Sequence, residues 1–422
     1  MKRVLLSLAL VIAGLGMYAQ SLDKAKDLLK GSKLMDAKAE IDKVMEVDKN
    51  QKNPEAWYTK AKIYVAIATN DPVKAQVPDA FSSAFDALKK YIEIDDKKLI
   101  LLQLDQYKPM NDIYQGYFAA GAANYNAAKY PDALIDFKGA IAAITFMASK
   151  GWVTQKFDTT STLYAGISAE KANDKDQAAV YYKTIVDSGV TKVGGNDLVD
   201  VYKWVADYFY QKNDMPHTWK YLEIGQQKYP KDLYWADTEL TIWRKVGNKD
   251  SLFARYDQIV KQFPDNHLFF FNYGLELYQY ASDTTTGKHP AYDSLVKRSQ
   301  ELLEKCLQLK PDYPQASMVM GQISYNEGVD LQAQVKAVKG TKPEDVKKRA
   351  DLRAEVGKRF DEAIPYLQKV DQDLGSSGKL KMDDKRVLRD SYDLLVTIYE
   401  QKNVKDRIDY YTNKFNNVDK DH

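Results

Sequence analysis

The feature that most constrains this chain is a stretch of small and bulky residues suited to two closely packed helices. Residues 121–141 read GAANYNAAKYPDALIDFKGAI. Small side chains let two helix axes approach closely, and residues 129–132 predict a turn between the helices. The chain has only 21 glycines and 13 prolines in 422 residues, about 8% where ~12% is usual, so few residues interrupt helices. We therefore expect an all-α protein.

The same segment resembles the tetratricopeptide repeat (TPR), a pair of helices about 34 residues long. Gly121, Ala133, Phe137 and Ala140 stand at sites where this repeat prefers small or bulky residues. Comparable spacings recur along the chain, at Trp57 and Ala61, Gly166 and Ala178, Ala206 and Leu222, Leu240 and Leu252, Gly274 and Leu303, and Gly321 and Ala363. The resemblance implies an α-solenoid of about nine stacked helical hairpins, wound as a right-handed superhelix.

The repeats and their interruptions divide the chain into five segments. We expect a signal peptide at 1–19, N-terminal TPR-like hairpins at 20–96, a central array at 97–265, hairpins with insertions at 266–375, including a projecting hairpin at 328–358, and a C-terminal capping hairpin at 376–422. Each hairpin exposes apolar faces that only its neighbour can cover, so most aromatic residues are expected in the core.

The first residues predict export. Lys2 and Arg3 precede an apolar run over residues 4–16, and Ala19 fits a signal-peptide cleavage site that leaves Gln20 first. The remaining chain has no run apolar enough for a transmembrane helix. Cys306 is the only cysteine, so no internal disulfide can form. We expect a periplasmic protein, with association with the outer membrane as a further option.

Charge and motif content argue against nucleic-acid binding and catalysis. The net charge of +2 falls to zero once the leader with Lys2 and Arg3 is removed, so no global field attracts nucleic acid. The four histidines have no metal-ligand spacing, and no nucleophile motif occurs. We therefore expect no catalytic residue, no metal and no cofactor.

The resemblance also implies a concave groove lined by the first helix of each hairpin. The chain places aromatic residues and amides at the sites that face a ligand in this family. The predicted groove residues are Tyr58, Phe118, Tyr125, Asn126, Tyr210, Gln211, Phe271, Tyr278, Gln279, Tyr325 and Asn326. Rings and amides suit peptide or glycan. The alternative is that the rings pack on the neighbouring hairpin and the amides only begin the turns.

The insertion at 328–358 carries a local surplus of positive charge. Residues 336–359 hold nine basic and four acidic side chains. We expect Gly340 to end one helix and Thr341 with Glu344 to form a capping box at the start of the next. This surplus predicts a binding surface for an acidic partner or phosphorylated head groups at Lys347, Lys348, Arg349 and Arg353. The alternative is a solvated helix face.

Two functions fit these features. The first is a non-enzymatic scaffold or adaptor in the periplasm that binds periplasmic or outer-membrane envelope proteins through the groove and the basic hairpin. The second is a glycan- or peptide-binding module of an outer-membrane uptake system. The scaffold is preferred, because the uptake proteins carry a lipid-anchoring cysteine that this chain lacks.

Overall fold

A computed structural model describes residues 21–95, 97–155, 157–283, 285 and 289–422. The signal peptide predicted at 1–19 lies outside these residues. The chain divides into two compact units, one ending at Trp235 and the other beginning at Ala236. The division falls inside a helix and inside the segment 97–265 that the sequence predicted as one central array. Each unit is described by itself.

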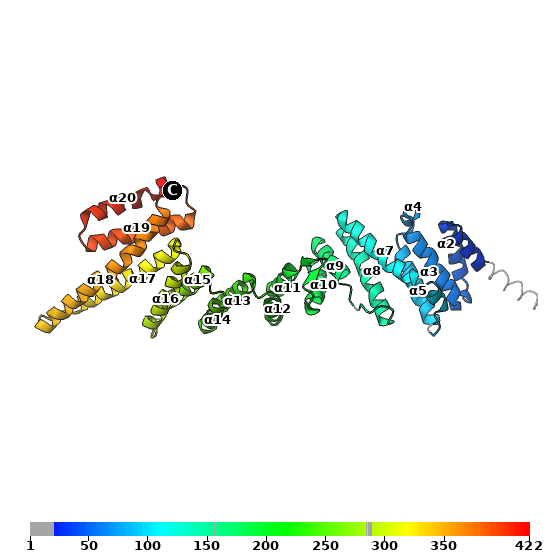
Figure 1. The fold of residues 1–422 in the computed structure, drawn as a ribbon, viewed down its shortest axis with the longest axis horizontal. Helices are drawn as coiled ribbons and strands as arrows, with labels where there is room; N and C mark the ends of the chain where they lie inside the picture. The colour runs from blue at the N-terminus through cyan, green and yellow to red at the C-terminus, as the bar shows by residue number, and fades with distance from the viewer. Residues whose placement is uncertain (1–20, 96, 156, 284, 286–288) are drawn as a thin grey trace, which may run out of the picture. The chain divides into compact units, whose positions relative to one another are not determined.

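The first unit is a series of antiparallel helix pairs (Figure 1). A helix at 21–30 pairs with α2, and the later pairs are α3 with α5, α7 with α8, α9 with α10 and α11 with α12. The helices are α2 (Leu34–Met45), α3 (Pro54–Ala68), α4 (Asp71–Lys74), α5 (Ala80–Ile94), α6 (Ile100–Leu104), α7 (Lys108–Asn126), α8 (Tyr130–Ser149), α9 (Thr159–Lys171), α10 (Lys175–Asp187), α11 (Val199–Gln211) and α12 (Met215–Lys228), with a 3-10 turn at Asn50–Lys52. The two strands β1 (Lys192–Val193) and β2 (Asn196–Asp197) pair antiparallel, Lys192 opposite Asp197.

The second unit continues the same pattern. Its pairs are α13 with α14, α15 with α16, α17 with α18 and α19 with α20. The helices are α13 (Leu233–Val246), which begins before the division, α14 (Lys249–Gln262), α15 (His267–Ala281), α16 (Tyr292–Leu309), α17 (Pro314–Ala337), α18 (Pro343–Leu374), α19 (Met382–Gln401) and α20 (Lys405–Asp421). The described residues thus form nine helix pairs, which confirms the all-α array of hairpins expected from the sequence. The superhelical twist stays a prediction.

Small residues on the first helix of a pair contact bulky residues on the second. A side-chain carbon at Gly121 would lie 2.9 Å from the ring of Phe137, and one at Gly166 would lie 2.6 Å from the ring of Tyr182. Gly321 stands in the same relation to Leu367. These glycines are buried, so the small residues set the helix separation as the sequence predicted.

A left-handed residue makes the turn inside several pairs. Asn173, Asn213 and Asn403 have φ near +60° and stand two residues before the second helix of their pair. Asparagine tolerates this conformation better than most residues. Ala128 takes the same place before α8, with φ +57°. The repeated turn explains how unrelated short sequences close similar hairpins.

The cores of the two units are continuous over several pairs. In the first unit one apolar core contains residues from Leu22 to Met147. It therefore includes residues of both the 20–96 and the 97–265 segments that the sequence predicted. In the second unit one core joins α13 to α17, and another joins α17 to α20. Stability in each unit therefore comes from neighbouring pairs together.

The insertion at 328–358 forms the outer turns of an elongated pair. α17 has 24 residues and α18 has 32, and Figure 1 shows the tip of this pair extending past α19 and α20. The helix ends differ from the prediction. α17 ends at Ala337, before Gly340, and α18 begins at Pro343 after an N-cap, Lys342, that makes no side-chain capping bond. The capping box expected at Thr341 and Glu344 is wrong, because proline fixes the start of α18 one residue later than that box requires.

Candidate partner-binding groove

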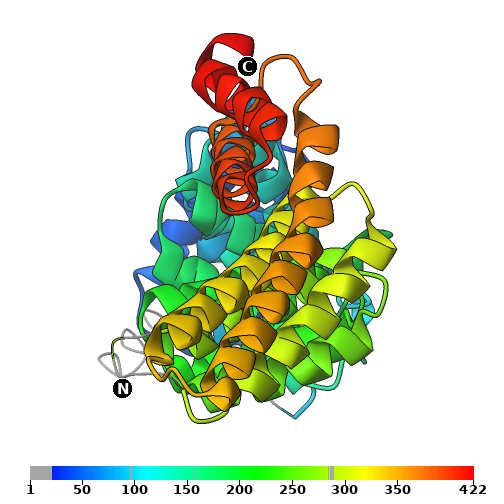
Figure 2. The ribbon, with the colours of Figure 1, turned by 90° about the vertical axis from the view of Figure 1, so that its left-hand side faces the viewer.

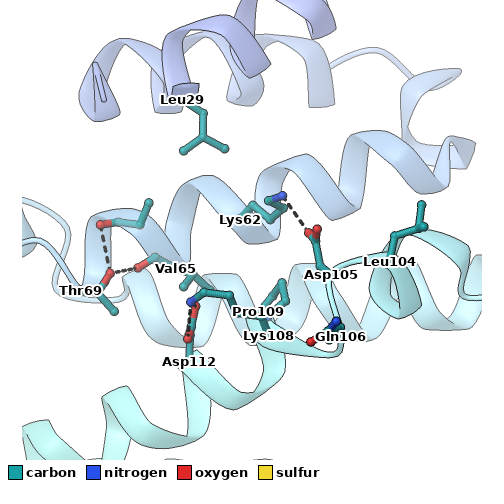
Figure 3. Close-up of a pocket in the computed structure, with 11 residues that line it drawn as sticks. Leu29, Lys62, Val65, Thr69, Leu104, Asp105, Gln106, Lys108, Pro109 and Asp112 are labelled. Atoms are coloured by element: carbon teal, nitrogen blue, oxygen red, sulfur yellow. Dashed lines mark hydrogen bonds and ion pairs between the residues drawn. The ribbon is translucent and has the colours of Figure 1, made fainter. Parts of the chain in front are cut away.

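A groove lies in the first unit, between the helix at 21–30, α3, α6 and the beginning of α7 (Figure 3). It encloses about 550 Å³, and an adjoining hollow along α3 and α6 adds about 250 Å³. Five apolar residues from these helices line the larger part: Leu29, Val65, Ala66, Leu104 and Pro109. A volume of this size suits a few apolar side chains of a ligand.

The short helix α6 forms one wall of the groove and is held in a constrained position. Leu99, directly before it, has φ +42°, and Gln106 and Tyr107, after it, have φ +52° and +60°. Each left-handed residue of this kind costs roughly 1–2 kcal/mol, so surrounding contacts must stabilise the segment. Leu102 supplies one, because it is fully buried. The constrained turn leaves Leu104 74% exposed at the groove edge.

Polar contacts hold α6 against α3. The hydroxyl of Tyr58 donates to the backbone oxygen of Leu101 at 3.0 Å and to a carboxylate oxygen of Asp105 at 2.7 Å. Lys62 Nζ lies 2.8 Å from the same oxygen of Asp105. Burial opposes ionisation of Asp105, but the bonds from Lys62 and Tyr58 outweigh it and lower its pKa. Burial and the bond to Asp105 raise the pKa of Tyr58.

Two further ion pairs stand at the groove rim. Lys108 lies 2.6 Å from Asp112 (Figure 3), and Lys26 lies 2.6 Å from Glu55. The rim therefore presents ion pairs around an apolar floor rather than a field of one sign. Such a site suits an apolar segment whose own charges are few.

Of the predicted groove residues, only Tyr58 lines this site. It is 5% exposed, with its hydroxyl engaged by α6, so it supports the floor and offers no free ring to a partner. Tyr278, predicted to line a groove in the second unit, is 7% exposed, and its hydroxyl accepts a 2.6 Å bond from Asn326. The expectation that Tyr58 and Tyr278 present open rings is wrong, because both rings are part of the core.

The other predicted rings are half-buried among neighbouring aromatic residues. The pairs and their centroid distances are Phe118 with Phe137 at 6.0 Å, Tyr125 with Tyr164 at 5.3 Å, Phe271 with Tyr313 at 5.1 Å and Tyr325 with Phe360 at 5.7 Å. Tyr210 is half-buried near the end of α11, and Asn126, Gln211 and Gln279 are exposed near helix ends. These contacts favour the alternative in which rings pack on neighbouring helices.

The basic hairpin offers three of its four predicted residues to solvent. Lys347, Lys348 and Arg353 are exposed on α18, and none has an ion pair in the part of the chain that the structure describes. Arg349 is different. It donates to the backbone oxygens of Val338 at 3.1 Å and Gly340 at 2.5 Å, so it closes the turn at the tip and is not a free docking group.

One stretch of the sequence that lies outside the repeat pattern marks the groove. Residues 99–104 read LILLQL, an apolar run that no repeat unit absorbs, and it forms α6 with its exposed Leu104. Its partners Lys62 and Asp105 were missed, because surface ion pairs between a helix and a loop leave no periodic pattern.

The described residues show no metal-binding or membrane-spanning feature. No group of three or more histidine, cysteine or acidic side chains could hold a metal ion there, and none of the helices is both long and apolar enough to cross a membrane. The thiol of Cys306 is buried, and burial raises its pKa to about 11.

Comparison with known proteins gives distant structural similarities only. No protein-family model and no curated protein sequence matches the chain. A TPR repeats protein from Bacteroides fragilis is similar over 67% of this chain and 98% of its own, at 12% identity and a TM-score of 0.29. PilF from Pseudomonas aeruginosa matches 61% of this chain and 97% of its own, at 13% identity and a TM-score of 0.25. The C-terminal part of a TPR repeat-containing protein from Cytophaga hutchinsonii matches 82% and 93%, at 15% identity and a TM-score of 0.26.

The fold assignment comes from the helix pairs themselves. Gly121, Gly166, Gly274 and Gly321 each contact a bulky residue of the paired helix, at the sites where the TPR pattern places a small residue. The chain therefore has a TPR-like fold of all-α hairpins.

Proposed function

We propose that this chain is a non-enzymatic scaffold of the periplasm that binds envelope proteins, with the groove of the first unit as a primary contact. The observation that supports this function most is the combination of an apolar floor with a rim of mutually paired charges. A protein segment with apolar side chains gains burial there without having to neutralise a charge. The exposed Leu104 adds an apolar edge to the same surface.

The hairpin formed by α17 and α18 supplies a second contact in this proposal. Lys347, Lys348 and Arg353 stand exposed there. Two contacts on one chain would raise the overall affinity above that of either alone. A glycan-binding module has less support, because Tyr125, Phe118 and Phe271 pack against other rings.

A matched pair of exposed leucine and isoleucine variants tests the groove. Leu104→Asp places a charge at the groove edge, whereas Ile135→Asp places one on α8, away from the groove, at a similarly exposed site. The tagged chain is crosslinked in the cells that make it and purified. We expect Leu104→Asp to lower recovery of one defined envelope protein roughly tenfold and Ile135→Asp to leave it unchanged.

The location is tested in the same cells. Osmotic release of the periplasm should yield the chain with Gln20 as its first residue. Equal recovery of the envelope protein with both variants would overturn the groove assignment, and retention of the full leader in the cytoplasm would overturn the proposed location.

A further inference from the structure

The elongated pair α17–α18 has a helix-packing face that is covered near its base and uncovered toward its tip. α19 runs beside α17 between two hydrogen bonds, Gln315 to Asp384 at 2.7 Å and Gln332 to Gln401 at 3.2 Å. α18 meets the end of α19 where Lys402 pairs with Asp361 at 2.6 Å. α17 and α18 continue beyond these contacts, as Figure 1 shows. In Figure 2 the tip of this pair faces the viewer.

Helical spacing identifies the residues that extend this face. Val346, Ala350, Arg353 and Gly357 follow one another at intervals of three and four residues and lie in line with Asp361, so they share its face of α18. Val346 is 50% exposed, and a side-chain carbon at Gly357 would meet no atom within 4 Å. The surface is thus open from the end of α19 to the tip.

α17 contributes the adjacent side of the same face. Gln332 contacts α19, and Lys336 stands four residues after it. Lys336 therefore lies on the same side of α17, one helical turn beyond the end of α19. Val329, three residues before Gln332, lies where α19 ends and is still 40% exposed, so it forms the inner edge of the open surface. We call Val329, Lys336, Val346, Ala350 and Arg353 the outer face.

The outer face carries positive charge that no acidic side chain of the hairpin neutralises. Lys336 and Arg353 are exposed, and the structure records no ion pair for either. On the opposite side, Arg359 is neutralised by Glu327 at 3.2 Å and Glu362 at 2.8 Å. Lys348, at helical spacing with Arg359, is exposed on that side as well, so the outer part of the hairpin carries a general surplus of positive charge. A partner on the outer face should therefore bring acidic groups.

We propose that the outer face binds an amphipathic helix of a partner protein, one whose apolar seam is flanked by acidic residues. The partner helix continues the packing that α19 begins, with its seam on Val346, Ala350 and Val329 and its carboxylates beside Arg353 and Lys336. A second copy of this chain is disfavoured, because a symmetric contact would set the same positively charged face against itself. This inference rests on the proposed scaffold function and specifies the second contact.

Site-specific photocrosslinking of the full chain in its own cells tests the proposal. Benzoylphenylalanine is placed at Ala350, on the outer face, and separately at Glu355, on the side of Arg359; both sites are exposed on α18. We expect a protein adduct from position 350 and little from position 355. The crosslinked peptide should carry acidic residues at helical spacing, and Arg353→Glu with Lys336→Glu should lower the adduct about tenfold.

A charge swap completes the test. Changing the partner's crosslinked carboxylate to lysine should restore the adduct of the Arg353→Glu chain, which a role of Arg353 in folding alone would not produce. Thermal unfolding followed by circular dichroism verifies that each variant stays folded. Equal partner adducts from positions 350 and 355, an adduct with a second copy, or an adduct with lipid would overturn this inference while leaving the scaffold function standing. No protein adduct from either position, with Leu104→Asp also without effect, would overturn both.

Discussion

The hydroxyl of Ser299 donates a 2.6 Å hydrogen bond to the backbone oxygen of Gly274, and both residues are buried between α15 and α16. Such a contact requires the two helices to approach closely. A side-chain carbon at Gly274 would lie 3.1 Å from the backbone oxygen of Ser299 and 2.9 Å from Leu303. Gly274 therefore sets the separation of this pair, as Gly121 and Gly166 do in the first unit.

Gly274→Ala should destabilise the second unit. Overpacking costs about 1–3 kcal/mol, which exceeds the roughly 1 kcal/mol that alanine gains in a helix. Urea unfolding should show the loss of free energy. Gly357→Ala is the control, because a side-chain carbon there meets open space in α18 and should raise the free energy of unfolding slightly. Equal effects of the two substitutions would contradict the packing argument.

Ala128→Asn should stabilise the turn between α7 and α8. Ala128 has φ +57°, while Asn173, Asn213 and Asn403 hold the corresponding turns of other pairs. Asparagine tolerates this conformation better than alanine, so the free energy of unfolding should rise by up to about 1 kcal/mol. The adjacent Ala127 has φ −83° and provides the control, since Ala127→Asn should give no gain. A lower melting temperature for Ala128→Asn would show that the turn is not strained.

The repeat pattern predicted the fold because its cause is local and periodic. A small residue and a bulky residue at fixed spacing, as in Gly121 with Phe137, must meet when two helices pair. The TPR resemblance extended this rule to about nine pairs, and the structure agrees. The helix ends at Gly340 and Thr341 were predicted less well, since several residues there can end or begin a helix.

The candidate groove could not be predicted from the same pattern. Its wall is α6, which lies between two helix pairs and depends on left-handed conformations at Leu99, Gln106 and Tyr107. Residues of these types rarely adopt that conformation, so no local rule predicts it. Tyr278 illustrates the converse error, because a ring at a ligand-facing repeat site can be buried by the next helix.

Asp136→Asn should change how stability depends on pH. Burial raises the pKa of Asp136 above its ordinary value of 3.8, although a 2.7 Å bond from Asn124 opposes the shift. The folded chain thus holds this proton more tightly than the unfolded chain, so stability falls as pH rises from about 4 through the folded-state pKa. Asparagine cannot ionise and should remove that loss.

The measurement is urea unfolding at several pH values. The stability of Asp136→Asn relative to the unsubstituted chain should increase as the pH rises from about 4 through the folded-state pKa of Asp136, and then stay level. Glu223→Gln, at an exposed site on α12, provides the comparison for loss of a carboxylate as such. A difference independent of pH would mean that Asp136 ionises as easily in the folded chain as in the unfolded one.

The Cys306 thiol should react only when the core of the second unit opens. It is fully buried in α16, and burial raises its pKa to about 11, so at pH 8 the native chain has almost no accessible thiolate. We expect Ellman's reagent to label one thiol per chain in urea and none rapidly without it. A Cys306→Ala chain with Ala254→Cys, at an exposed site on α14, should react at once.

Gly274 packs against α16, the helix that holds Cys306. Gly274→Ala should therefore accelerate Cys306 labelling by about tenfold for each 1.4 kcal/mol of lost stability. Rapid labelling of the native chain would show that α16 does not pack against α15 as the Ser299 bond requires.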